Sequence, residues 1–177
     1  MSFGRCTYKG NNFRILWESQ DAKLIVDNFT SIADNVTIFL GGNHPLTWIT
    51  QYPFGYLHND IYQRDKSGDS SILNTKGNVV IGSDVWIGAG VTIMSGITIG
   101  DGARIATNSH VVKNVKPYET IGGNPGRSIG FRFTEDQIEE LLKIKWWEWD
   151  DSRIKENVYL LCGSDINNFI EKNRITD

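Results

Sequence analysis

The residue types and patterns that are rare in this chain already limit the functions it can have. Among 177 residues there are only two cysteines, Cys6 and Cys162, far apart and without CxxC spacing. Two such thiols predict neither a disulfide framework nor a cysteine-based metal site. No apolar run reaches the roughly 18 residues of a membrane-spanning helix, and the first residues, MSFGRCTYKG, lack the apolar stretch of a signal peptide. We therefore expect a cytoplasmic protein without a membrane span.

An excess of charge of one sign is missing as well. The chain has 18 Lys and Arg against 21 Asp and Glu, a net charge of −3, with no block of like charge and no basic stripe. Nucleic acid and anionic membranes are therefore not expected as partners. With 40% hydrophobic and 22% charged residues, the chain is long enough for one core and one appendage.

What the chain does have is a six-residue repeat. An aliphatic residue returns at every sixth position, and a second aliphatic or small residue follows four places after each. The first set is Ile81, Ile87, Ile93, Ile99, Ile105 and Val111, and the second is Val85, Val91, Ile97, Ala103, Ser109 and Val115. Six is the period of neither a helix nor a flat strand. Each unit instead forms one side of a triangular coil, and three units close a coil of about 18 residues. The repeat therefore predicts a parallel β-helix.

The repeat is interrupted once. A shorter tract holds Val26, Ile32 and Ile38, but Ile38 and Ile81 lie 43 positions apart, which is not a multiple of six. We therefore expect the register to break there and a loop to be extruded over about 41–78. Its first half is rich in aromatic residues and its second half is polar. Long loops in compact domains are usually functional or disordered, and the aromatic half favours a packed, functional loop.

After residue 130 the pattern becomes helical. Thr134 and Gln137 have the spacing of a capping box, and a helical face follows them. Further helices are expected over 151–161 and 164–171. Trp146, Trp147 and Trp149 are expected to attach this tail to the coil or to a neighbouring subunit. The predicted domains are a β-helix domain over 1–130 and a C-terminal α-helical tail over 131–177.

Four segments together resemble a known family. They are GGNHPLTWITQYPF at 41–54, GSDVWIGAGVTIMSGITIGDGARI at 82–105, GGNPGR at 122–127, and KWWEWD at 145–150 followed by LLCGSDI. These segments, in this order, resemble the hexapeptide-repeat acyltransferases. The most similar branch is the xenobiotic acetyltransferase subfamily, which includes type B chloramphenicol and streptogramin acetyltransferases and enzymes that O-acetylate bacterial surface sugars. The resemblance implies a mainly β fold, a left-handed parallel β-helix, assembled as a homotrimer with acetyl-CoA bound in active sites between subunits.

His44 is the candidate catalytic residue. Acetyl transfer from a thioester to an alcohol needs a base that works near pH 7, and imidazole is suited to this. The resemblance places His44 at the family's catalytic histidine, and direct transfer needs no acyl-enzyme. His58 and His110 are expected to be peripheral. The spacings of 14 and 52 residues between the histidines do not fit the three-histidine zinc site of the carbonic anhydrases that share this solenoid, so no metal is expected.

The other site residues are expected in three groups. Backbone amides at small or corner positions should bind the pantetheine arm of acetyl-CoA, at Trp86, Gly88, Ala89, Ala106 and Thr107. The resemblance places phosphate-binding cations at Lys113 and Arg127, with Lys116 nearby. The loop should line the acceptor site with Asn43, Trp48, Tyr52 and Phe54. The sequence does not assign the residue that orients His44 or the group that stabilises the oxyanion.

The expected function is an acetyl-CoA-dependent O-acetyltransferase whose acceptor is a sugar hydroxyl in bacterial surface polysaccharide synthesis. One alternative is a chloramphenicol- or streptogramin-type antibiotic acetyltransferase. Another is N-acetylation of a nucleotide-linked amino sugar. A different class, the non-catalytic solenoid scaffold, would need neither the loop histidine nor the cations at the end of the coil.

Overall fold

The strands of the protein form the three faces of a triangular coil. The structure is a computed structural model that describes residues 1–17, 21–54, 61 and 74–174. Sheet A contains β1 (Ser2–Phe3), β4 (Leu24–Val26), β7 (Val79–Ile81) and β10 (Thr98–Ile99). Sheet B contains β2 (Tyr8–Lys9), β5 (Ser31–Ile32), β8 (Trp86–Ile87), β11 (Arg104–Ile105), β13 (Glu119–Gly122) and β14 (Arg127–Phe131). Sheet C contains β3 (Arg14–Leu16), β6 (Thr37–Phe39), β9 (Thr92–Ile93) and β12 (His110–Val111).

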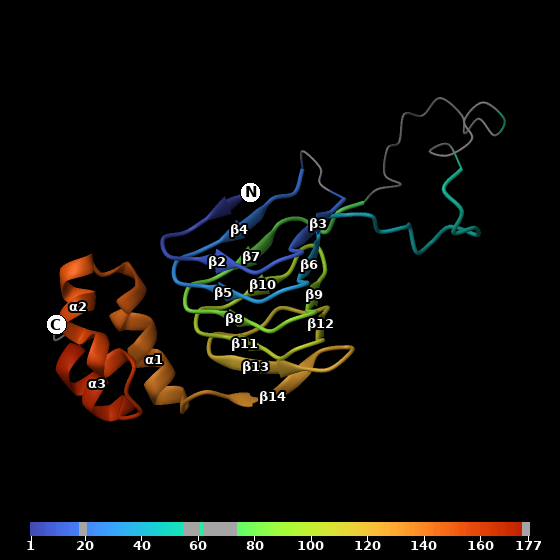
Figure 1. The fold of residues 1–177 in the computed structure, drawn as a ribbon. Helices are drawn as coiled ribbons and strands as arrows, with labels where there is room; N and C mark the ends of the chain where they lie inside the picture. Colours follow the sequence, from blue (N-terminus) through green and yellow to red (C-terminus); the bar gives the residue numbers. More distant parts are fainter. Residues whose placement is uncertain (18–20, 55–60, 62–73, 175–177) are drawn as a thin grey trace.

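All neighbouring strands in these sheets are parallel except β13 and β14, which pair antiparallel at the end of the coil. Successive coils stack on one another, and the helices lie beside the coil (Figure 1). The mainly β fold with a parallel β-helix is therefore confirmed.

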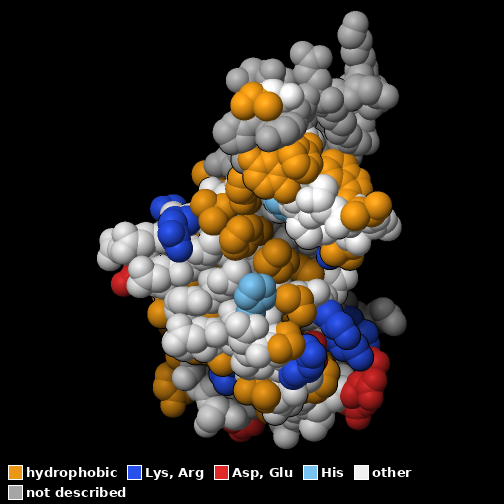
Figure 2. Space-filling model, turned by 90° about the vertical axis from the view of Figure 1, so that its right-hand side faces the viewer, with side chains coloured by type: hydrophobic (Ala, Val, Ile, Leu, Met, Phe, Trp, Pro, Cys, Tyr) orange, Lys and Arg blue, Asp and Glu red, His pale blue; other side chains and the backbone are white. Residues whose placement is uncertain are grey.

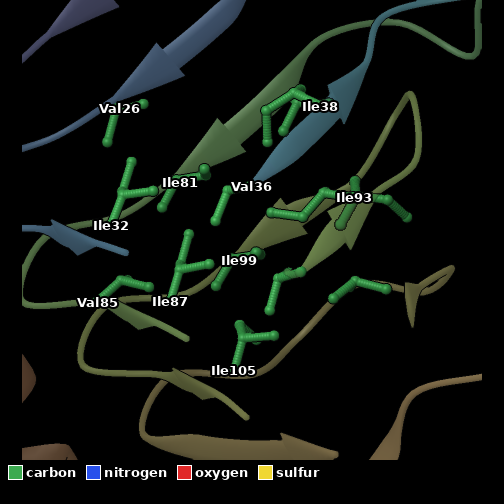
Figure 3. Packing of buried hydrophobic residues seen from close by; sticks show 14 of the residues in the cluster. Val26, Ile32, Val36, Ile38, Ile81, Val85, Ile87, Ile93, Ile99 and Ile105 are labelled. Carbon is green, nitrogen blue, oxygen red and sulfur yellow. The ribbon is translucent and has the colours of Figure 1, made fainter. Parts of the chain in front are cut away.

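The hexad aliphatics fill the inside of the coil. Ile81, Ile87, Ile93 and Ile105 are completely buried, and they stack in columns between successive coils (Figure 3). Val85, from the second set of positions, is also buried. Burying one such side chain contributes about 1.5–3 kcal/mol, so the repeated aliphatic residues are the main source of the stability of the coil.

The turns at the corners of the coil explain why Gly, Asn and Asp recur in the repeat. A left-handed backbone recurs one residue before five of the six second-set positions, at Asp84, Gly90, Gly96, Gly102 and Asn108. Gly, Asn and Asp adopt this conformation most easily. The three corners are named by the sheets they join, as the A–B, B–C and C–A corners.

The first coil, β1 to β3, was not predicted from the sequence. Phe3, Lys9 and Ile15 keep the six-residue spacing, but Lys9 interrupts the aliphatic pattern. Lys9 lies in the terminal coil, where its side chain is exposed, and its ammonium group sits 5.5 Å from the centre of the Phe13 ring. The aliphatic repeat is therefore interrupted in the terminal coil, where the side chain at this position is exposed to solvent.

The loop interrupts the chain but not the ladder. Val26 pairs with Ile81 and Ile38 pairs with Ile93, so the coils on the two sides of the loop stack in register. The six-residue spacing is therefore broken in the sequence, as expected, but the strands before and after the loop still pair in register. A smaller insertion precedes it, because Ile15 and Val26 lie 11 positions apart instead of six. Both insertions fall between sheet C and sheet A, and the described start of the large one, 41–54, projects away from the coil (Figure 1).

The tail consists of α1 (Glu135–Ile144), the short 3-10 helix η2 (Trp146–Glu148), α2 (Asp151–Leu161) and α3 (Ile166–Asn173). The capping box of Thr134 and Gln137 is present. The predicted boundary at 130/131 falls within the last residues of β14. None of the helices in the described ranges is long and apolar enough to cross a bilayer.

The tail packs against the A–B corner of the coil. The Phe29 and Trp146 ring centres are 5.0 Å apart, and Trp147 and Trp149 are buried in the same cluster as Tyr118 of the coil. From the first coil, the Arg5 guanidinium donates to the Trp149 carbonyl and to the Asp151 carboxylate. The tryptophans therefore attach the tail to its own coil.

Candidate active site

The base of the loop is tied to the third coil. The Asn43 side-chain amide donates to the carbonyl of Asn74 at 2.8 Å and to the Ser95 hydroxyl at 3.0 Å. Because Asn43 and Asn74 stand at opposite ends of the extruded segment, these bonds hold its two ends together. Asn43 was predicted to contact the acceptor, and its side-chain amide is used for these bonds inside the protein. Gly42 precedes it with a φ of +80°, where a Cβ atom would overlap the Trp17 ring.

His44 is exposed on this loop, and its ring is oriented by a backbone carbonyl. Its Nδ1 lies 2.7 Å from the carbonyl oxygen of Gln51. A carbonyl can only accept a hydrogen bond, so Nδ1 carries the proton and the neutral ring presents Nε2 as a proton acceptor. The Gln51 side-chain amide donates in turn to the Pro45 carbonyl at 3.3 Å. Gln51 is therefore the residue that orients His44.

The aromatic residues predicted to contact the acceptor follow directly on Gln51. The rings of Tyr52 and Phe54 lie 4.8 Å apart between centres, and both side chains are more than a third exposed. Trp48 is half-buried, and its backbone amide donates to the Pro45 carbonyl at 3.5 Å. The short stretch between His44 and Phe54 thus holds a histidine with an available nitrogen and a pair of accessible aromatic rings. His58 lies outside the described residues.

The prediction that five backbone amides bind the cofactor needs a correction. The amides of Trp86, Gly88 and Ala106 donate to carbonyls of the next coil at 2.8–3.0 Å. These amides belong to the strands or directly follow them, so they complete the ladder between coils and are not available to a ligand. The amides of Ala89 and Thr107 have no hydrogen-bond partner within the described part of the chain.

Ala89 and Thr107 lie one above the other at the B–C corner. A Cβ atom on Gly88 would come within 2.7 Å of the Thr107 backbone nitrogen, so the two coils approach closely here only because residue 88 is glycine. The Trp86 side chain remains partly exposed on sheet B. Two stacked amides are therefore left to donate hydrogen bonds outside the coil.

The predicted cations lie at the end of the coil that is remote from the loop. Arg127 begins β14, pairs with Gly122 across the hairpin and is exposed. Lys113 and Lys116 are exposed in the chain after β12. Figure 2 shows the face from which the loop emerges, with hydrophobic side chains below the loop and Lys and Arg side chains gathered further down.

His110 lies within the coil, whereas His44 lies on the extruded loop. It is half-buried on β12, and its backbone binds the turn of the β13–β14 hairpin through the Gly123 carbonyl and the Gly126 amide. Within the described ranges, no three His, Cys, Asp or Glu side chains are grouped so that they could hold a metal ion.

Comparisons with known proteins agree with this arrangement. Residues 78–113 match the family described as bacterial transferase hexapeptide (six repeats). A chloramphenicol acetyltransferase of Escherichia coli is 41% identical over 167 residues, which cover 90% of this chain and 78% of that protein. A probable macrolide acetyltransferase of Lysinibacillus sphaericus is 45% identical over 142 residues, covering 80% and 78%. A virginiamycin A acetyltransferase of Staphylococcus aureus is 41% identical over 156 residues, covering 88% and 70%.

Solved structures support the fold. The polySia specific acetyltransferase NeuO superposes with a TM-score of 0.54 at 23% identity, over 89% of this chain and 62% of that one. The N-acyltransferase AntD from Bacillus cereus, in complex with dTDP and coenzyme A, gives a TM-score of 0.56 at 18% identity, over 81% and 70%. At these identities the likeness concerns the fold alone.

Proposed function

The chain belongs to the hexapeptide-repeat acetyltransferases, in their xenobiotic branch, and on that premise we propose that it transfers an acetyl group from acetyl-CoA directly to a hydroxyl of a small molecule, with His44 as general base. That the protein is an acetyltransferase follows from its relatives. The observation that carries the proposed mechanism is the contact of His44 Nδ1 with the Gln51 carbonyl, because it leaves Nε2 free on an exposed ring.

In the proposed reaction, Nε2 of His44 accepts the proton of the acceptor hydroxyl while the hydroxyl oxygen attacks the thioester carbonyl carbon. The new C–O bond forms, the C–S bond breaks, and the proton passes from Nε2 to the departing sulfur. A positioned base of this kind contributes typically about 10²–10⁴-fold to the rate. The acetyl group is already activated as a thioester, so the mechanism needs no enzyme nucleophile.

The B–C corner is the proposed binding surface for acetyl-CoA. The amides of Ala89 and Thr107 would donate to the carbonyl oxygens of the pantetheine arm, because the ladder leaves these two amides unused. Arg127 and Lys113 would bind the phosphates, which need cationic partners. Both cations are exposed, and the only side-chain hydrogen bond of Arg127 in the described chain goes to the neighbouring Gly126 carbonyl.

We propose further that the active site lies between subunits of a homotrimer. The loop with His44 leaves the coil at the C–A corner, whereas Ala89 and Thr107 lie at the B–C corner. The described part of the loop that carries His44, 41–54, also projects away from its own coil (Figure 1). A neighbouring copy could bring its B–C corner to this loop, which supports a site made from two chains.

The relatives bear on the choice of acceptor. Their names refer to chloramphenicol, a macrolide and virginiamycin A, which makes hydroxyl-bearing antibiotics the first acceptor class to propose. The sugar hydroxyl expected from the sequence is the second candidate. The exposed pair of Tyr52 and Phe54 supports it, because aromatic rings can pack against the faces of sugar rings.

An acceptor screen tests the proposal. The purified protein is incubated with acetyl-CoA and with chloramphenicol, a streptogramin, a macrolide, simple glycosides or nucleotide-linked amino sugars, and free thiol is measured. We expect thiol release that depends on one hydroxyl-bearing class, with an O-acetylated product found by mass spectrometry. An N-acetylated product would contradict the hydroxyl acceptor. Acetyl-CoA that neither binds nor turns over with any acceptor would instead favour a scaffold.

A further inference from the structure

Two buried serines, Ser83 and Ser95, occupy the same position in the six-residue repeat. Each lies two residues after a buried hexad isoleucine, Ser83 at the A–B corner and Ser95 at the C–A corner. Ser83 is 3% exposed and Ser95 is 1% exposed. The Ser83 hydroxyl accepts from the Asn28 backbone amide at 3.3 Å, and the Ser95 hydroxyl accepts from the Lys76 backbone amide at 3.3 Å. Both serines therefore bind the backbone that passes the same corner one coil earlier.

Ser95 makes a second contact. The side-chain amide of Asn43 donates to its hydroxyl oxygen at 3.0 Å, whereas Ser83 accepts no second bond within the described ranges. Asn43 lies near the start of the extruded segment and Lys76 lies near its end. One buried oxygen of the coil thus contacts both ends of the segment that carries His44.

The turn that contains Ser95 fits closely against the end of the extruded segment. Gly96 has a φ of +75°, and its amide donates to the Gly77 carbonyl at 3.1 Å. A Cβ atom on Gly96 would come within 2.5 Å of the Lys76 carbonyl oxygen. Residues 95–96 and 76–77 therefore pack directly on each other, which restricts the position of the Ser95 hydroxyl.

The contact with Ser95 acts next to the proposed base. His44 follows directly on Asn43, and consecutive Cα atoms are about 3.8 Å apart, so a displacement of Asn43 also displaces the backbone of His44. The Gln51 carbonyl orients the His44 ring, but Gln51 belongs to the same loop. That bond therefore does not determine where the loop lies relative to the coil. The bond from Asn43 to Ser95 does, because Ser95 is part of the coil.

We propose that Ser95 is a positioning residue for His44, and that it holds the loop, through Asn43, in a fixed place relative to the coil. The proposal rests on the proposed function, because it takes His44 as the base. It gives Asn43 a structural role in place of the predicted contact with the acceptor. A misplacement of about 1 Å at an active site can cost about 10²-fold in rate, so the loss of this bond should be visible in kcat.

A comparison of two serine variants tests the proposal. Ser95→Ala removes the bonds to Asn43 and Lys76, and the matched control Ser83→Ala removes the equivalent bond to Asn28 alone. Both variants lose a buried hydrogen bond, so both should melt slightly below the wild type. We expect Ser95→Ala to lower kcat about tenfold and to leave KM for acetyl-CoA unchanged. Ser83→Ala should leave both constants unchanged, and equal kcat values in the two variants would overturn the positioning role.

A double-mutant cycle separates positioning from contact with the acceptor. Asn43→Ala should lower kcat to the same extent as Ser95→Ala, and the double variant should be no slower than either, because the two residues act as one unit. Additive losses would overturn the proposal, as would a raised KM for the acceptor in Asn43→Ala alone. Asn43 is only half-buried, so Asn43→Ala keeps the proposal testable if Ser95→Ala does not fold.

Hydrogen exchange without substrates gives a readout that does not depend on the reaction. Peptides that cover 41–54 should exchange faster in Ser95→Ala and at the wild-type rate in Ser83→Ala. Unchanged exchange in Ser95→Ala would overturn the proposal. Failure of the proposed function gives a different pattern, in which His44→Ala keeps wild-type turnover while Ser95→Ala still exchanges faster. That pattern would support the bond between coil and loop and would overturn its role in acetyl transfer.

Discussion

A single backbone carbonyl determines which nitrogen of His44 can act as a base. Because the Gln51 carbonyl accepts from Nδ1, the ring is fixed both in orientation and in tautomer. The Gln51 side chain fastens the same loop through the Pro45 carbonyl. The contact with Gln51 therefore fixes the proton on Nδ1 of His44 and leaves Nε2 unprotonated, as general base catalysis requires.

Replacement of His44 by alanine is the direct test of this arrangement. We expect His44→Ala to lower kcat by about 10²–10⁴-fold, the usual contribution of a positioned base. Thiol release in the presence of the best acceptor measures it, and the melting temperature should not change. Ile49→Ala is the matched control, because Ile49 is fully exposed on the same loop and has no proposed role. Turnover near that of the wild type would remove His44 from the mechanism.

Individual residues also show what sequence reasoning can reach. His44 was predicted as the base because its loop segment resembles a family motif, and this role stays a prediction. Gln51 was not identified, because a contact across an irregular loop leaves no periodic pattern. The sequence also did not show that the backbone amides of Trp86, Gly88 and Ala106 are already hydrogen-bonded, since amides in or next to strands are needed by the ladder.

Helices and strands were predicted well wherever the repeat of apolar residues has no interruption. The capping box and the three helices of the tail lie where the sequence placed them, because caps and helical faces are local signals. The first coil was missed, because Lys9 stands in a column of aliphatic residues. A coil with one solvent-exposed end needs fewer apolar side chains, so periodicity is weakest there.

One ion-pair network joins elements of the tail and gives it a dependence on pH. The Glu140 carboxylate accepts from Lys143 in α1 and from Arg174 after α3, each at 2.9 Å. These bonds, first from Lys143 and then from Arg174, hold the pKa of Glu140 below its usual value of 4.5. A carboxyl group with a lowered pKa stabilises the fold above its unfolded pKa, and this stabilisation is lost as the pH falls through the lower, folded value.

Glu140→Gln should therefore lower the melting temperature at pH 7 by a small amount, at most about 4 °C, because both basic partners of Glu140 are exposed. The difference from the wild type should shrink as the pH falls below 4.5. Thermal unfolding over a pH series measures both effects. Glu156→Gln, on the exposed side of α2, is the matched control and should behave like the wild type at each pH. A difference that persists at low pH would mean that Glu140 acts through packing instead of charge.

At the scale of the whole molecule, one chain presents its loop and its proposed cofactor surface at different corners. The proposed trimer would unite them, with a mass in solution close to three times 20.0 kDa. Arg127→Ala should raise KM for acetyl-CoA more than it lowers kcat, and His44→Ala should remove the base. Each substitution damages a different half of the same proposed site.

Mixed trimers test this arrangement. When His44→Ala and Arg127→Ala subunits are co-expressed, some interfaces should combine an intact His44 with an intact Arg127. We expect such mixtures to regain activity at low acetyl-CoA concentration, beyond the sum of the separate variants. If the site lies within one chain, mixing restores nothing, and that result would contradict the inter-subunit site. Separately purified variants combined without exchange of subunits serve as the control.

Both insertions leave the coil at the C–A corner while the strands above and below them stay in register. The length of the β-helix is thus set by the number of stacked coils and not by the number of residues in the chain. Evolution, or a protein engineer, can lengthen or exchange the segment over 41–78 while the aliphatic columns stay intact. If the loop contacts the acceptor as proposed, acceptor preference and thermal stability can vary independently, and this corner is where a segment would be exchanged to change the acceptor.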